Sequence, residues 1–279
     1  MKLSAKKKPE PEKTSLEDIE KSSKSALMRD IINKILGLAK LDSNVVIIGE
    51  IGSGKKRLAR IIHQNSYRSN GPFHSFYCVD VNEDEYKEAF LEHLQFEENH
   101  IVLKYDAIEK ARQGILYLDQ FSELSPYFML NIIHSFVHCS KQHFKYDKTN
   151  RPRLILSMNQ ESYQNIYNTS TWKSVLQLIN PIGIMLPPLR ERKEDIPMYI
   201  DFFLKEIKDK YQEWNDLKIS SQAFSECSNY NWPGNLMQLK NAILQGAILS
   251  YGKTIESRHL PFSMSWKLPY DFEDNKHLY

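Results

Sequence analysis

The stretch VVIIGEIGSGKKRLARII, residues 45–62, decides the fold of this chain. Its first four residues are β-branched and predict a short buried strand. Three glycines, Gly49, Gly52 and Gly54, then precede Lys55, and the residues that follow carry apolar side chains at helical spacing. Strand, glycine loop, lysine and helix therefore occur in the order that a phosphate-binding loop requires.

The spacing G-x-x-x-x-G-K gives this loop a specific chemistry. Small residues leave backbone N–H groups exposed to surround an oxyanion, and the start of the helix adds partial positive charge. Lys55 would reach the terminal phosphates of a nucleotide. Lys56 occupies the next position, where such loops usually carry a Ser or Thr for the metal ion. The alternative is a simple glycine turn between a strand and a helix, although both flanks fit the context of the motif.

Composition narrows the class of protein. The 279 residues suffice for one sizeable core and a smaller unit, and 37 basic against 35 acidic residues give a net charge of only +2. Charge alone therefore predicts neither nucleic-acid nor membrane binding. The three cysteines, Cys78, Cys139 and Cys227, have no paired spacing and are expected to be buried apolar residues in a reducing compartment. With no membrane-spanning run or signal core in view, we expect a cytoplasmic protein.

Five short apolar segments alternate with helical patterns along the chain. They lie at residues 45–48, 73–81, 114–119, 153–157 and 182–186. Strands that alternate with helices predict an α/β fold whose parallel sheet is covered on both sides. A charged helix is expected between the second and third strands, at residues 83–97, with Leu94 in its apolar stripe.

Two polar features near the middle of the chain are candidates for metal binding. The third strand ends in Asp119, the position where a phosphate-loop enzyme places the carboxylate that holds the water shell of Mg²⁺. Asp119 could instead only cap the following helix. His134 and His138 are four residues apart on a predicted helix and His143 follows, but no acidic third ligand is spaced to complete a site.

The pattern also predicts domain boundaries. We expect a flexible N-terminal lead at residues 1–24, an α/β nucleotide-binding subdomain at 25–190, a smaller helical subdomain at 191–265 and a tail at 266–279.

Five segments together resemble the AAA+ ATPase domain of the sigma-54-dependent transcription activators. They are GEIGSGKK at Gly49, LYLDQ at Leu116, SMNQ at Ser157, LPPLRERKEDIP at Leu186 and NWPGNLMQLKNAI at Asn231. The resemblance implies an αβα sandwich with a five-stranded parallel sheet, a helical lid, and rings that hold ATP and Mg²⁺ at subunit boundaries. The nucleotide-binding residues it implies are Gly49, Glu50, Gly52, Ser53, Gly54, Lys55, Lys56, Asp119 and Asn159. Asp119 would hold Mg²⁺ through water, and Asn159 would sense the γ-phosphate.

The chain departs from the family where ATP is hydrolysed. Gln120 replaces the glutamate that polarises the attacking water, and an amide cannot accept its proton. Trp172 and Leu178 stand at the positions of the two arginine fingers, with Lys173 as a possible shifted substitute. Met237 replaces the nucleotide-sensing arginine of the lid. No catalytic set remains intact, so whether the chain is an enzyme is left open.

The partner-binding loop differs as well. The family engages its sigma factor through a loop reading GAFTGA, whereas the corresponding residues, 95–100, read QFEENH. We therefore do not expect ordinary remodelling of sigma-54. Direct DNA binding is not expected either, because no helix-turn-helix pattern is found.

Three interpretations follow. The leading one is an ATP-binding, hydrolysis-deficient module that pairs with itself or another AAA+ subunit and serves as a regulatory or scaffolding subunit for a protein of unknown identity. The second is an active ATPase that remodels a transcription or assembly partner, with arginines supplied by another AAA+ subunit. The third is a nucleotide-free platform for protein interactions.

Overall fold

The computed structural model describes residues 23–90, 93–97, 100–104, 106–142 and 150–261. Most of the expected lead, the whole expected tail and His143 lie outside these residues. The described chain divides into two compact units. The sheet unit contains Arg29–Ile48 and Lys55–Ile184, and the helical unit contains Ser23–Met28, Gly49–Gly54 and the chain from Met185 onward.

A five-stranded sheet forms the centre of the sheet unit, as the sequence predicts. Its strands are β1 (Val45–Ile48), β2 (Phe73–Tyr77), β5 (Ile115–Asp119), β6 (Arg153–Met158) and β7 (Ile182–Met185), in the order β2-β5-β6-β1-β7. The pairs β1–β6, β5–β6 and β2–β5 are parallel. Every residue of β1 and β6 is buried, which explains the continuous apolar sequence of β1 and the apolar run at residues 154–156 of β6.

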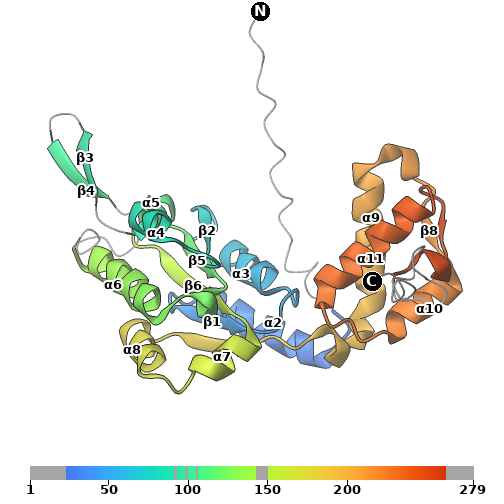
Figure 1. Cartoon of the computed structure of the whole chain (residues 1–279), viewed down its shortest axis with the longest axis horizontal. Helices are drawn as coiled ribbons and strands as arrows, with labels where there is room; N and C mark the ends of the chain where they lie inside the picture. The colour runs from blue at the N-terminus through green and yellow to red at the C-terminus, as the bar shows by residue number, and fades with distance from the viewer. Residues whose placement is uncertain (1–22, 91–92, 98–99, 105, 143–149, 262–279) are drawn as a thin grey trace, which may run out of the picture. The chain divides into compact units, whose positions relative to one another are not determined.

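Helices flank this sheet (Figure 1). They are α2 (Ala26–Ala39), α3 (Lys55–Gln64), α4 (Glu83–Phe90), α5 (Asp106–Lys110), α6 (Pro126–Gln142), α7 (Gln160–Ile166) and α8 (Ser170–Ile179). Helix α8 begins at a side-chain cap, because the Thr169 hydroxyl accepts a hydrogen bond from the backbone N–H of Trp172 at 3.2 Å. The apolar faces of α4, α6 and α8 pack into one core with β5 and β6.

The expected helix at residues 83–97 is wrong in its second half. Helix α4 ends at Phe90, and β3 (His93–Glu97) pairs antiparallel with β4 (His100–Lys104). This hairpin extends away from the sheet in Figure 1. Leu94 therefore pairs with Leu103 in the hairpin and is not part of a helical stripe. The segment that replaces GAFTGA includes the end of β3 and the start of β4, while residues 98–99 lie outside the described part.

The helical unit has its own core. Helices α9 (Ile196–Lys210), α10 (Ser221–Asn229) and α11 (Asn235–Leu249) surround it, with a small parallel pair formed by β8 (Lys218–Ile219) and β9 (Thr254–Ile255). Short 3-10 turns lie at Leu189–Glu191, Lys193–Asp195, Gln212–Trp214 and Ser257–His259. Trp232 is fully buried in this core, and its indole N–H donates to the carbonyl of Cys227 at 2.8 Å. A buried aromatic ring with a satisfied polar group is a strong packing anchor.

Two of the three cysteines behave as predicted, and the side chain of Cys139 lies outside what the structure describes. Cys78 and Cys227 are both buried and unoxidised. Burial, followed by the nearby Glu226 charge, raises the pKa of Cys227 to about 12. Within the described part of the chain, none of the helices has the length and apolar character needed to cross a membrane.

Candidate functional site

The phosphate-loop glycines belong to the helical unit and have backbone shapes that favour glycine. Gly52 has a φ of 75° and Gly54 a φ of 108°. A Cβ on Gly52 would lie only 2.4 Å from the carbonyl oxygen of Gly234. Both the backbone conformation and the close approach therefore exclude a side chain at Gly52.

Residues at the start of α11 hold this loop by hydrogen bonds. The side-chain amide of Asn235, which is fully buried, donates to the carbonyl of Ile51 at 2.9 Å and to Glu50 Oε2 at 3.1 Å. Its Oδ1 accepts from the N–H of Leu189 at 2.7 Å. The N–H of Leu236 donates to the carbonyl of Gly52 at 3.0 Å. The loop is thus fixed by specific partners that satisfy its polar groups.

Two arginines of the LPPLRER segment add further contacts to the loop. Arg190 donates to both carboxylate oxygens of Glu50, at 2.6 and 2.8 Å, and this bidentate hydrogen bonding raises the pKa of the Arg190 guanidinium. The buried Arg192 donates from Nη2 to the carbonyl of Ser53 at 2.6 Å. The Ser53 hydroxyl turns back to the carbonyl of Glu50 at 2.7 Å.

In the sheet unit, the two lysines after the loop have different environments. Lys55 is the first residue of α3 and is buried. Lys56 is exposed, and its Nζ donates to the Ser75 hydroxyl at 2.9 Å. An ammonium group cannot ligate a cation, so Lys56 supplies no metal ligand at the position where a hydroxyl is usual.

Asp119 ends β5 and carries two hydrogen bonds on one carboxylate oxygen. Its Oδ1 accepts from the hydroxyls of Ser157 at 2.6 Å and Tyr117 at 3.0 Å. Burial, and secondly the charge of Asp119, raises the pKa of Tyr117 well above its ordinary value, so the phenol stays protonated as a donor. A short 3-10 turn, Phe121–Glu123, follows the strand. Asp119 does not cap it, because Gln120 occupies its cap position.

Gln120 is held in a left-handed conformation directly after Asp119. Its φ is 59°, which is uncommon for a residue other than glycine, and its N–H donates to Ser157 Oγ at 3.0 Å. Its side-chain Oε1 is buried and has no hydrogen-bond partner among the described residues. A buried amide oxygen without a partner among the described residues is therefore found on the residue that directly follows Asp119.

Asn159 follows β6 at the same edge of the sheet. Its backbone N–H donates to the Ser122 hydroxyl at 3.2 Å. It occupies the cap position of α7, but its side chain makes no capping hydrogen bond. Because carboxyl ends of parallel strands share one edge, the sheet unit brings Asp119, Gln120 and Asn159 to this edge.

The positions where the family carries arginines are occupied by uncharged residues, two of which pack in the core of the sheet unit. Trp172 is 2% exposed and contacts Tyr163 edge-on, with ring centroids 6.0 Å apart. Leu178 packs against the same core. The neighbouring Lys173 is exposed on α8. In the helical unit, Met237 is 59% exposed and offers a thioether in place of a cation.

Among the side chains that the structure describes, none completes a metal site with the histidine pair of α6. His134 and His138 both lie exposed on α6. Over the described ranges, no group of three His, Cys, Asp or Glu residues is arranged to hold a metal ion.

Three residues of the site have roles that the sequence did not reveal. Ser157 joins Asp119 to the backbone of Gln120, Arg190 pairs with Glu50, and Asn235 holds the loop carbonyl of Ile51. All three lie within the segments SMNQ, LPPLRER and WPGN, which carry the family resemblance. The resemblance therefore pointed to these segments, but it did not say which groups the three side chains contact.

Comparison with protein families gives two matches. Residues 22–175 match the Sigma-54 interaction domain, and residues 190–275 match the AAA+ ATPase lid domain.

Comparison with individual proteins agrees with the family matches. The chain is 28% identical over 254 residues to the transcriptional regulatory protein ZraR of Salmonella typhimurium, covering 86% of this chain and 55% of ZraR. It is 28% identical over 240 residues to the regulatory protein AtoC of Escherichia coli, covering 85% and 52% of the two chains. The chain thus spans about half the length of these relatives.

A solved structure shares the same architecture. NtrX from Brucella abortus in complex with ATP superposes with a TM-score of 0.71 at 28% identity, covering 86% of this chain and 56% of NtrX. The structure of the same protein in complex with ADP gives the same TM-score and identity.

Proposed function

Because the chain belongs to the Sigma-54 interaction domain family, which matches more than half of it, we propose that it is an AAA+ module that binds ATP without hydrolysing it unaided. In this proposal it acts as a regulatory or scaffolding subunit that associates with itself or with another AAA+ subunit. Ground-state phosphate binding and transition-state stabilisation depend on different groups, so the first can persist without the second.

The residues present fit a nucleotide. The loop retains its glycine conformations and Lys55 begins the following helix. The similar NtrX of Brucella abortus has been solved in complex with ATP and with ADP. The loop amides and Lys55 would therefore bind the phosphates of ATP.

The residues also fit Mg²⁺ held through water. Among the described residues, both hydrogen bonds to the Asp119 carboxylate reach Oδ1, so Oδ2 could accept from a metal-bound water. Mg²⁺ keeps several waters in such sites and needs few protein ligands. The ion would neutralise phosphate charge there, with Asp119 as its main protein partner.

The observation that carries the proposal of deficient hydrolysis is Gln120 at the water-polarising position. A general base must accept a proton from the attacking water, and a carboxamide cannot do so near neutral pH. The packing of Trp172 and Leu178 in the core and the thioether of Met237 leave three further positions without positive charge. An arginine finger alone accounts for about 10³–10⁵-fold in related reactions.

Two measurements on the purified protein test this proposal. A fluorescent ATP analogue should bind with Mg²⁺ present, and Lys55→Ala should weaken that binding. Phosphate release from ATP should stay at the background rate. Robust turnover that Lys55→Ala abolishes would contradict the proposal.

A second candidate function is an active ATPase completed by another AAA+ subunit. It is favoured by the exposed Lys173, which lies beside the buried Trp172 and could present a cation to a neighbouring subunit. Size-exclusion chromatography of a mixture with a candidate subunit, followed by ATPase assay of each fraction, distinguishes the two functions. Hydrolysis that appears only in the mixed complex, and falls with Lys173→Ala, would support the second.

A further inference from the structure

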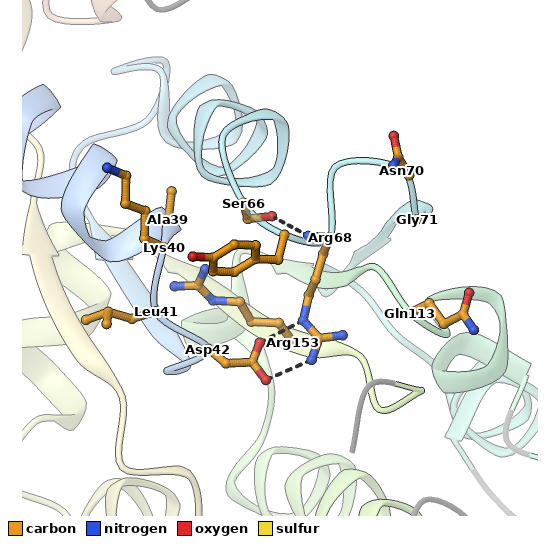
Figure 2. A pocket seen from close by; sticks show the side chains of 11 residues that line it. Ala39, Lys40, Leu41, Asp42, Ser66, Arg68, Asn70, Gly71, Gln113 and Arg153 are labelled. Carbon is orange, nitrogen blue, oxygen red and sulfur yellow. Dashed lines mark hydrogen bonds and ion pairs between the residues drawn. The ribbon is translucent and has the colours of Figure 1, made fainter. Parts of the chain in front are cut away.

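A cavity lies at the amino ends of the strands in the sheet unit, at the edge of the sheet opposite to Asp119. It has a volume of about 570 Å³ and is lined by the end of α2, the connection from α3 to β2, Gln113 and Arg153 (Figure 2). This volume lies within the range of sites that hold small organic molecules. Its lining combines the charged side chains of Lys40, Asp42, Arg68 and Arg153 with the aliphatic Leu41 and the aromatic Tyr67.

Arg153, the first residue of β6, is a buried cation in the wall of this cavity. It is 2% exposed, its Nε donates to the carbonyl of Ser43 at 2.7 Å and its Nη2 to that of Leu38 at 3.0 Å. Its Nη1 is buried and has no hydrogen-bond partner among the described residues. An unpaired buried donor costs free energy. The Nη1 group would therefore gain from a hydrogen bond to an oxyanion, which guanidinium groups bind strongly.

The nearest carboxylate is already engaged elsewhere. Asp42 accepts from Arg68 through both of its oxygens, at 2.7 and 2.8 Å, and Figure 2 shows this pair beside the Arg153 side chain. Arg68 therefore occupies both oxygens of Asp42, and Lys40 adds another positive charge to the lining. Burial lowers the pKa of Arg153, which reflects the cost of holding its charge away from water.

The exposed part of the lining includes one aliphatic and one aromatic side chain. Leu41 is 51% exposed and Tyr67 is 88% exposed, and both line the cavity. Exposed aromatic and aliphatic side chains beside a buried cation match a ligand with an organic body and an anionic end.

We propose that this cavity binds a small organic oxyanion, a carboxylate or phosphate ester, whose oxygens accept a hydrogen bond from Nη1 of Arg153. The organic part of the ligand lies against Leu41 and Tyr67. An ordered water could satisfy the Nη1 donor, but it would leave the excess positive charge unbalanced. A bound anion and a bound water can be distinguished, because only a site for an anion requires ligand binding that depends on the charge of the ligand.

Isothermal titration calorimetry at constant ionic strength tests the proposal with three probes of similar size, benzoate, phenyl phosphate and the neutral benzyl alcohol. At least one anion should bind wild-type protein below about 10 mM, and benzyl alcohol should bind at least tenfold more weakly. The anion that binds distinguishes a carboxylate from a phosphate ligand. Absence of binding by both anions, or equal binding of benzyl alcohol, would overturn the proposal.

Variants locate the binding site. Arg153→Lys keeps the charge but loses the planar fork, and it should weaken anion binding about tenfold or more. Since Arg153 also supports two backbone carbonyls, Leu41→Glu provides a test at an exposed position and should weaken binding about threefold or more. Leu41→Lys should preserve or strengthen it.

The matched control for charge is Tyr127→Glu, an exposed aromatic residue at the start of α6, which should leave anion affinity unchanged. The same titrations are repeated in a Lys55→Ala background, which removes binding of phenyl phosphate at the phosphate loop and leaves only binding at the cavity. Equal effects of Leu41→Glu and Tyr127→Glu, or loss of binding in Lys55→Ala, would refute the cavity as the site.

Discussion

At the scale of single residues, His63 near the end of α3 links stability to pH. Its Nε2 lies 2.9 Å from the carbonyl oxygen of Gly71, and burial lowers its pKa below the ordinary value of 6.5. The unfolded chain therefore takes up a proton more readily than the folded chain. The stabilisation that comes from neutral His63 is complete above about pH 6.5 and is lost as the pH falls through the lower folded-state pKa.

His63→Gln should reduce this acid sensitivity, because a glutamine amide can donate to Gly71 without titrating. Urea unfolding at about pH 7.5 and about pH 5 measures the loss of stability in each protein. The exposed His134→Gln serves as the control. An identical pH dependence in wild type and His63→Gln would contradict this role.

Two glycines with different surroundings give a second prediction at this scale. Gly37 is exposed within α2 and has open space around a built Cβ, whereas Gly52 has a positive φ and a backbone oxygen in that place. Gly37→Ala should raise the free energy of unfolding by about 0.5–1 kcal/mol, because alanine favours the helix. Gly52→Ala should lower it by about 1 kcal/mol or more. Chemical denaturation of both variants tests the contrast, and equal shifts would refute it.

At the scale of elements, the buried carboxylate of Asp195 holds the chain that leads into α2. It accepts from the Ser23 hydroxyl at 3.0 Å and from the backbone N–H groups of Lys24 and Ser25 at 2.6 and 3.0 Å. These donors precede a helix whose first turn has no acidic residue. Asp195 therefore supplies the negative charge that a helix start favours.

Asp195→Ala should lower the free energy of unfolding by about 2–3 kcal/mol, because several buried donors lose a charged acceptor. The exposed neighbour Glu194→Ala is the matched control and should change it by less than about 0.5 kcal/mol. Urea denaturation followed by circular dichroism measures both. A small effect of Asp195→Ala would show that water replaces the carboxylate.

Some secondary-structure elements could be predicted from the sequence and others could not. The strands of the central sheet were predictable because they are short apolar runs with turn residues on each side. The β3–β4 hairpin was not, since the charged and apolar residues after Phe90 also fit a helix. Its pairing of Leu94 with Leu103 is a contact between segments, which local periodicity cannot supply.

For the candidate site, the sequence indicated which residues to examine and not how they contact one another. Gly52 and Lys55 were predicted from the spacing of the loop, and Asp119 from its place at the end of an apolar strand. The bond between Ser157 and Asp119 joins positions 38 residues apart, and that between Asn235 and Glu50 joins positions 185 apart. Such contacts are set by the fold, so only the coordinates could assign them.

At the scale of the whole molecule, ATP binding should appear as a gain in stability. A ligand that binds only the native state stabilises it by about 2.7 kcal/mol at a hundredfold excess over its dissociation constant. We expect the melting temperature to rise with ATP and Mg²⁺ in wild type, and to rise little in Lys55→Ala. Thermal unfolding across a titration of ATP tests this. No shift at high ATP would favour the nucleotide-free platform.

The helical unit is assembled from three separate parts of the chain, and this has a consequence for biosynthesis. The glycine loop is translated early, but Asn235, whose amide holds its Ile51 carbonyl, lies 184 positions later. At about 5–20 residues per second, a ribosome leaves the loop without this partner for about 10–40 seconds. The phosphate loop therefore reaches its final hydrogen bonding only when nearly all of the described chain has been made.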